Sequence, residues 1–92
     1  TRVFKRTDDN WHPSYKLDGW YRGIERTLLV EVSLLPISNG KTRVCVCVWG
    51  GDDCGMERDL DTETEAISIF MSVIALDTVN MEDLTLFGFG WC

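Results

Sequence analysis

The chain has 92 residues, 45% of them hydrophobic and 11% aromatic, and its 9 Lys and Arg against 15 Asp and Glu give a net charge of -6. This length suits one small domain over residues 1–92, and the apolar content excludes a chain that stays disordered for lack of hydrophobic side chains. No apolar run reaches the roughly 18 residues of a membrane-spanning helix, and no basic segment precedes an apolar one as in a secretory leader. We expect a cytoplasmic protein that does not bind membranes.

The charge is unevenly distributed along the chain. Residues 1–51 hold 8 basic and 5 acidic side chains, whereas residues 52–92 hold 1 basic and 10 acidic side chains. An acidic surface repels the phosphates of nucleic acids. We therefore expect no direct binding to nucleic acid.

The first half of the chain has the pattern of β-structure. Val3 and Phe4 indicate a short strand, residues 8–14 have the composition of a loop, and an alternating pattern that begins near Tyr21 leads into an apolar run over 28–35. A second run covers 42–49. Asn39-Gly40 lies between the two runs and tolerates the positive φ angles of a type I′ turn, which predicts a β-hairpin. If these two residues form the turn, the numbers of paired residues sum to 79.

This register assigns the two faces of the hairpin. The predicted core face consists of Leu28, Val30, Val32, Leu34, Cys45, Cys47 and Trp49. The opposite, open face then carries Val44, Val46 and Val48. An exposed apolar face of this kind indicates an interaction site. It supports one functional hypothesis, a structural or self-assembling module, such as a virion component, that forms a homodimer through these valines.

The second half adds a strand, a helix and a last strand. Residues 56–60 alternate with acidic side chains on one face, which is typical of a strand that protects a sheet edge. Thr62 and Glu65 match the capping box of a helix, and apolar residues recur at helical spacing from Ala66 to Ile74. Residues 80–83 have the composition of a turn, and 84–91 alternate as in a strand. The predicted order is β-β-β-α-β, an α+β fold with one helix packed on one face of a small antiparallel sheet.

The cysteines and the histidine do not indicate a catalytic or metal site. Cys45 and Cys47 point to the same face of a strand, and the chain lacks the two close cysteine pairs of a zinc site. We expect reduced thiols, with a Cys54–Cys92 disulfide as the alternative. His12 is the only histidine, and no Gly-rich phosphate loop is present. We expect a non-catalytic protein without a cofactor or metal.

The acidic residues form the densest cluster of charge in the sequence. One interpretation is a solvated edge strand followed by a helix whose first turn favours acids through its dipole. The other is a negative patch that docks on a positively charged partner, with charge complementarity steering the association. The candidate partner-binding carboxylates are Asp52, Asp53, Glu57, Asp59, Asp61, Glu63 and Glu65.

Aromatic residues near the predicted N-terminal loop give a second indication of a binding surface. Trp and Tyr dominate the energetic hot spots of protein interfaces. We expect Trp20 to cover the open valine face, and we include Trp11 and Tyr15 among the candidate partner-binding residues.

Three features taken together carry a resemblance. They are the small size, the hairpin around Asn39-Gly40, and the run Glu57-Arg58-Asp59-Leu60-Asp61-Thr62 that leads into a helix. In these features the chain is similar to the acidic inhibitors that phages carry against bacterial defence systems, such as the anti-CRISPR proteins. The resemblance implies a viral protein that binds a nucleic-acid-binding complex in the host cytoplasm and inhibits it by occupying its basic surface.

Overall fold

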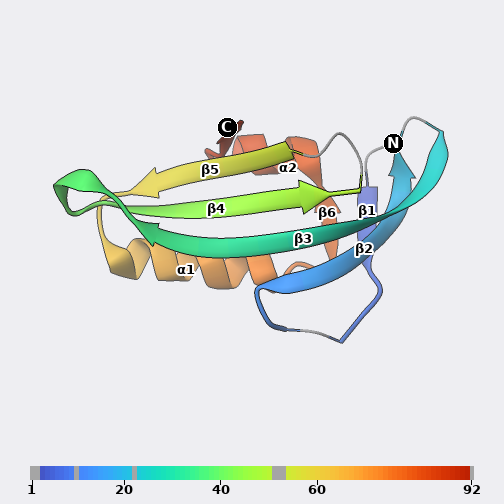
Figure 1. Ribbon diagram of the computed structural model, residues 1–92, viewed down its shortest axis with the longest axis horizontal. Helices are drawn as coiled ribbons and strands as arrows, with labels where there is room; N and C mark the ends of the chain where they lie inside the picture. Colours follow the sequence, from blue (N-terminus) through green and yellow to red (C-terminus); the bar gives the residue numbers. More distant parts are fainter. Residues whose placement is uncertain (1–2, 10, 22, 51–53, 92) are drawn as a thin grey trace.

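The computed structural model describes residues 3–9, 11–21, 23–50 and 54–91. Its strands form one seven-stranded antiparallel sheet with the order β6-β1-β2-β3-β4-β5-β7. The sheet curls around the long helix α1, which lies along its inner face (Figure 1). The elements are β1 Val3–Arg6, β2 Ser14–Tyr21, β3 Ile24–Pro36, the 3₁₀ turn Ser38–Gly40, β4 Thr42–Trp49, β5 Cys54–Leu60, α1 Glu63–Ile74, β6 Thr78–Asn80, α2 Met81–Leu86 and β7 Gly90–Trp91.

The α+β class is confirmed, but the predicted order β-β-β-α-β is wrong. Beyond that order, the described residues form β1, which Val3 and Phe4 indicated, the strands β2 and β6, and a second, short helix. Of the predicted last strand, only Gly90–Trp91 is a strand. The alternation near Tyr21 belongs to two strands, because Tyr21 pairs with Ile24 across a tight connection in which Gly23 has a φ of 75°. No helix in the described part of the chain is long and apolar enough to cross a membrane.

The predicted hairpin is present as β3 and β4, but its register differs by one residue. Three residues, Ser38–Gly40, form the loop, and the amide of Ile37 donates to the carbonyl oxygen of Lys41 at 3.0 Å. Asn39 and Gly40 have the positive φ angles of 64° and 72° that the sequence predicts. Because the loop is one residue longer than expected, the numbers of paired residues sum to 78, as in Val32 with Val46.

A slip of one residue exchanges the two faces of a strand. Val44, Val46 and Val48 are therefore core residues, with exposed fractions of 0%, 1% and 5%. The prediction of an exposed valine face is wrong, and the homodimer contact that we expected there has no accessible surface. Cys45, Cys47 and Trp49 lie instead on the outer face of the sheet, which α1 does not cover. The core consists mainly of inner-face residues of β2 to β5 and of Ala66, Val73 and Ile74 from α1.

Helix α1 begins where the capping box predicts. Thr62 is the N-cap, and its hydroxyl oxygen accepts the amide proton of Glu65 at 3.2 Å and donates to the Glu65 carboxylate at the same distance. The apolar stripe then turns Ala66, Val73 and Ile74 towards the sheet.

We expect Thr62→Ala to lower the free energy of unfolding by about 1 kcal/mol, because an orphan amide at the helix start loses its acceptor. The matched control is Thr64→Ala, which removes an exposed threonine inside the first turn and should change stability by less than about 0.5 kcal/mol. Urea denaturation of both variants measures the difference, and equal midpoints would contradict the role of the cap.

The segment 84–91 is not one strand. Asn80 caps the short helix α2 through a hydrogen bond from the amide of Glu82 at 3.1 Å. The helix ends in a Schellman motif: the amide of Phe89 donates to the carbonyl of Leu84 at 3.1 Å, and Gly88, with a φ of 83°, donates to Thr85 at 3.2 Å. This motif turns Phe89 into the core and leaves Phe87 exposed.

Candidate protein-binding surface

The structure divides the predicted acidic cluster into two groups. Asp52 and Asp53 lie outside the described residues. Glu57 and Asp59 lie on the outer face of β5, where Arg43 of β4 pairs with both. Arg43 Nε donates to Asp59 Oδ1 at 2.8 Å and lies 3.4 Å from a carboxylate oxygen of Glu57. Arg43 therefore balances one of these two negative charges within the protein.

The same contact fixes the ionisation of Asp59. The hydrogen bond from Arg43 lowers the pKa of Asp59 below its ordinary value of 3.8. Because the pKa of the folded state is the lower one, the ion pair stabilises the protein above pH 3.8 and its contribution is lost as the pH falls through the folded-state pKa.

We expect Arg43→Met to raise the pKa of Asp59 towards its ordinary value, since the hydrogen bond and the opposite charge disappear together. A titration of the carboxyl ¹³C shifts followed by NMR measures the change. Asp61 is the internal control, because its contact with Lys41 does not involve Arg43. An unchanged Asp59 titration would show that the pair does not form in solution.

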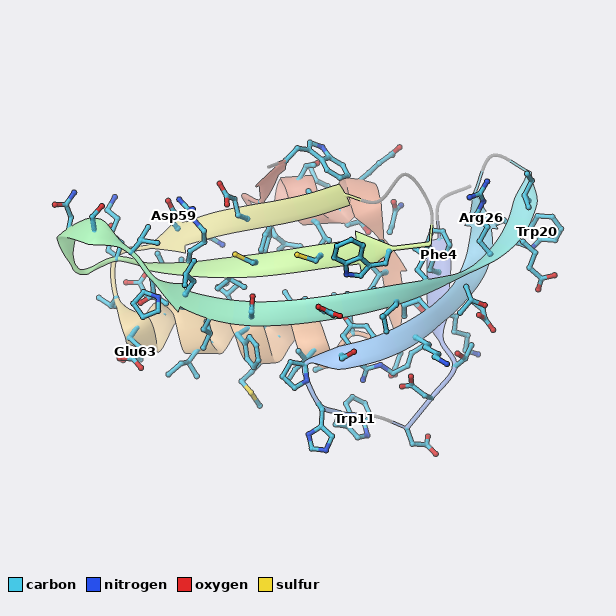
Figure 2. All side chains as sticks on the ribbon, viewed as in Figure 1. Phe4, Trp11, Trp20, Arg26, Asp59 and Glu63 are labelled. Carbon is cyan, nitrogen blue, oxygen red and sulfur yellow. The ribbon has the colours of Figure 1, made fainter. Side chains whose placement is uncertain are left out.

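The remaining acids belong to a surface that we call the acidic helix layer, defined as residues 61–89. This segment contains no Lys, Arg or His. All six of its acidic residues are exposed: Asp61, Glu63, Glu65, Asp77, Glu82 and Asp83. Figure 2 shows Glu63 at the start of α1, at the same end of the molecule as Asp59.

Helix dipoles favour acids in a first turn, which accounts for Glu63, Glu65, Glu82 and Asp83. Helix dipoles also favour basic residues in the last turn of a helix, and neither α1 nor α2 has a basic residue in its last turn. The layer is therefore more acidic than helix stability requires. Lys41, which lies outside the layer, has its ammonium nitrogen 3.7 Å from Asp61 Oδ1. The Asp61 side chain is nevertheless 82% exposed.

Exposed apolar side chains accompany these acids. Ile67 and Met71, one turn apart on α1, are 43% and 54% exposed, and Leu86 and Phe87 at the end of α2 are 83% and 59% exposed. Because residues 84–91 were predicted to form a strand, the exposed positions of Leu86 and Phe87 were not predicted. Asp77, Glu82 and Asp83 were not among the candidate residues, because they lie outside the acidic run over 52–65. Asn80 and Gly88, which mark the two ends of α2, are the signals that could have revealed this helix.

Tyr15 is not a surface residue. It is 1% exposed, its hydroxyl donates to the carbonyl oxygen of Val73 at 3.4 Å, and burial raises its pKa against the opposing effect of Arg6. The Arg6 guanidinium carbon lies 3.9 Å from the centre of the Tyr15 ring and 4.7 Å from that of Trp11. Tyr15 therefore belongs to the core, where it holds a buried arginine.

Trp11 and Trp20 are both exposed, but they lie apart from the acidic end of the molecule. Trp11 is on the loop after β1, and Trp20 is near the tip of the β2–β3 hairpin (Figure 2). The expectation that Trp20 covers the valine face is wrong, because α1 covers it and Trp20 is 54% exposed. Arg6, whose guanidinium carbon lies 4.7 Å from the centre of the Trp11 ring, donates to the carbonyl oxygen of Ile74 at 2.6 Å. Trp11 therefore lies beside the C-terminal end of α1, whereas Trp20 lies at the tip of the β2–β3 hairpin.

The cysteines of β4 are free thiols on the outer face, half-buried rather than part of the core. Burial, Glu57 and Cys47 raise the pKa of Cys45, which keeps this thiol protonated. A Cys54–Cys92 disulfide lies outside the described residues. Within the described ranges, no group of three or more His, Cys, Asp or Glu side chains is arranged to hold a metal ion.

Comparison with protein-family models, with curated proteins and with solved structures found no match.

Proposed function

We propose that the protein is a non-catalytic binding protein that docks its acidic helix layer on the basic surface of a partner. The observation that carries the proposal is the segregation of charge: residues 61–89 present six exposed carboxylates and no base. A partner with a matching positive surface gains attraction over the whole layer, and long-range attraction raises the rate of association. The exposed apolar side chains of α1 and α2 supply the contacts that charge alone lacks.

The partner class that fits best is a nucleic-acid-binding protein or complex. Such proteins carry extended basic surfaces that neutralise phosphates. An acidic layer seated on that surface would exclude nucleic acid, so that the protein acts as an inhibitor. The resemblance to anti-CRISPR proteins in size, hairpin and acidic run supports the same proposal, with a host defence complex as the target.

The test is affinity capture from bacterial lysate with two charge variants of equal net charge. Glu63→Lys with Glu82→Lys reverses two carboxylates of the acidic helix layer, whereas Glu25→Lys with Glu31→Lys reverses two exposed carboxylates of β3. We expect the wild type and the β3 variant to retain the same nucleic-acid-binding protein, and the helix-layer variant to lose at least about tenfold in affinity.

Salt and duplex DNA should both displace the captured protein, since salt screens exposed charges beyond about 10 Å at 0.1 M and DNA competes for the same basic surface. Capture that resists both treatments, or equal loss in the two variants, would refute the proposal. Circular dichroism of each variant confirms that it is folded before capture.

A further inference from the structure

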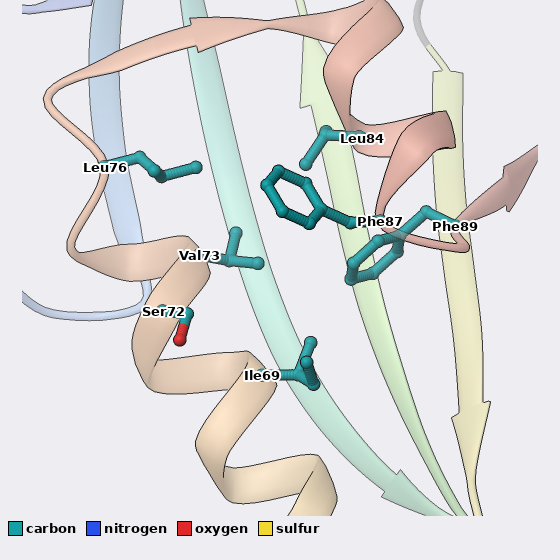
Figure 3. Close-up of a pocket in the computed structure, with 7 residues that line it drawn as sticks. All are labelled: Ile69, Ser72, Val73, Leu76, Leu84, Phe87 and Phe89. Atoms are coloured by element: carbon teal, nitrogen blue, oxygen red, sulfur yellow. The ribbon is translucent and has the colours of Figure 1, made fainter.

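An apolar pocket of about 60 Å³ opens between α1 and α2 within the acidic helix layer. Figure 3 shows α1 and its C-terminal end on one side and α2 with the following turn on the other. Six of the seven lining side chains are apolar: Ile69, Val73, Leu76, Leu84, Phe87 and Phe89. The seventh, Ser72, lies at an exposed position of α1.

The pocket has a fixed floor and an open side. Val73, Leu84 and Phe89 are 6%, 2% and 3% exposed, whereas Phe87 is 59% exposed. The Schellman motif sets the backbone under Phe87, and Arg58 Nη1 donates to the Phe87 carbonyl oxygen at 2.9 Å. The exposed phenylalanine is thus held beside a buried apolar floor.

Its volume limits what the pocket can receive. Pockets for drug-sized molecules and cofactors have about 300–1,000 Å³, and this one has about 60 Å³. It has room for part of one aliphatic or aromatic side chain. A single anchor residue of a partner is therefore a better fit than a free metabolite.

Three exposed acidic residues lie close in sequence to residues that line the pocket. Glu65 lies one helical turn before Ile69, Asp77 directly follows Leu76, and Asp83 directly precedes Leu84. Two bases lie near these segments: Arg58 donates to the Phe87 carbonyl oxygen in the turn after α2, and the buried Arg6 donates to the carbonyl oxygen of Ile74. An anchor residue with basic neighbours would thus meet carboxylates on both helices.

We propose that the pocket receives one bulky aliphatic or aromatic side chain of the partner, carried on a segment whose flanking residues are Lys or Arg. This inference rests on the proposed function and adds the recognition element to it. A buried anchor in a small pocket is the usual form of an interface hot spot. Two copies of the chain that meet symmetrically through this layer fit poorly, because six carboxylates of each copy would face six of the other.

The experiment uses three synthetic heptapeptides and methyl NMR of the intact protein. The first peptide is Gly-Lys-Lys-Leu-Lys-Lys-Gly, the second has alanine in place of leucine, and the third has glutamate in place of every lysine. The methyl resonances of Ile69, Val73, Leu76 and Leu84 report on the pocket. We expect the leucine peptide to shift them and to bind at least about tenfold more tightly than the alanine peptide, and the glutamate peptide to cause no shift.

Two variants, each with a phenylalanine introduced on α1, test whether the preference for the leucine peptide depends on the pocket. Ser72→Phe places an aromatic ring at the pocket and should reduce the affinity for the leucine peptide to that for the alanine peptide. Thr64→Phe adds the same ring two turns away on α1 and should leave the preference unchanged. Methyl spectra of the free variants show whether each keeps its fold.

The contradicting outcomes are distinct. Equal affinity for the leucine and alanine peptides, or full binding by Ser72→Phe, would overturn the pocket inference while leaving the acidic helix layer as a docking surface. Binding of the glutamate peptide would overturn the requirement for basic flanks. If neither lysine peptide binds, this inference fails, and the capture experiment with the two charge variants decides the proposed function separately.

Discussion

Replacing Val46 with lysine is expected to lower the free energy of unfolding by about 3–5 kcal/mol. Val46 is 1% exposed and is paired with Val32 on β3 and Met56 on β5, both of them core residues. An ammonium group there would lie in the apolar interior without a partner, and an unpaired buried charge costs about 3–5 kcal/mol. Domains of this kind have a total stability of about 5–15 kcal/mol, so the substitution removes between about a fifth and all of that stability.

The matched control is Cys47→Lys, one residue further along β4. This side chain lies on the outer face, opposite Glu31 of β3, so the new ammonium can reach water and a carboxylate. We expect it to remain folded with nearly unchanged stability. Guanidinium denaturation of the two variants also tests the register, because a hairpin whose paired numbers sum to 79 would reverse the two results.

Gly19→Ala is expected to cost about 3 kcal/mol, a large effect for one added methyl group. A Cβ at Gly19 would lie 2.6 Å from Cδ1 and 2.8 Å from Cα of Phe4 and would also meet the carbonyl oxygen of Val3. Two of these atoms belong to the backbone of β1, so the strand itself must move. Phe4 is 1% exposed, and its displacement would disturb the core as well as the pairing of β1 with β2.

Gly90→Ala makes the same chemical change in β7, where an added Cβ meets nothing within 4 Å. Its effect should stay within about 0.5 kcal/mol. Thermal unfolding measures both variants, since 1 kcal/mol lowers Tm by roughly 4–8 °C in a domain of this size. If the Gly19→Ala and Gly90→Ala variants had the same Tm, the close approach of β1 to β2 would be refuted.

The sequence predicted those elements that depend on residues close together in the chain. The capping box placed the start of α1, Asn39-Gly40 placed the hairpin loop, and alternation placed β5. The exact pairing could not be predicted in this way, because a turn of two or three residues uses the same Asn-Gly pair. One additional loop residue was enough to exchange Cys45 with Val46 between the outer face and the core.

The errors in the candidate surface have longer-range causes. Tyrosine is a residue type that is common at interfaces, yet Tyr15 is buried. It contacts Arg6 and also Val73, which is far away in the sequence. The pairing of Arg43 with Asp59 depends on the β4–β5 register, which sequence spacing does not fix. Residues 84–91 alternate by chance between apolar and other residues, and the helix ends at Asn80 and Gly88 decide the structure there.

The pairing of β1 with β6 has a consequence for how the protein is made. Phe4 pairs with Val79, and Lys5 with Thr78, so this edge of the sheet joins the two ends of the chain. Contacts between residues so distant in sequence form slowly, because a long loop must close first. During synthesis, β1 therefore lacks one of its two neighbours until residues 78–80 have emerged from the ribosome, and the complete sheet cannot form before then.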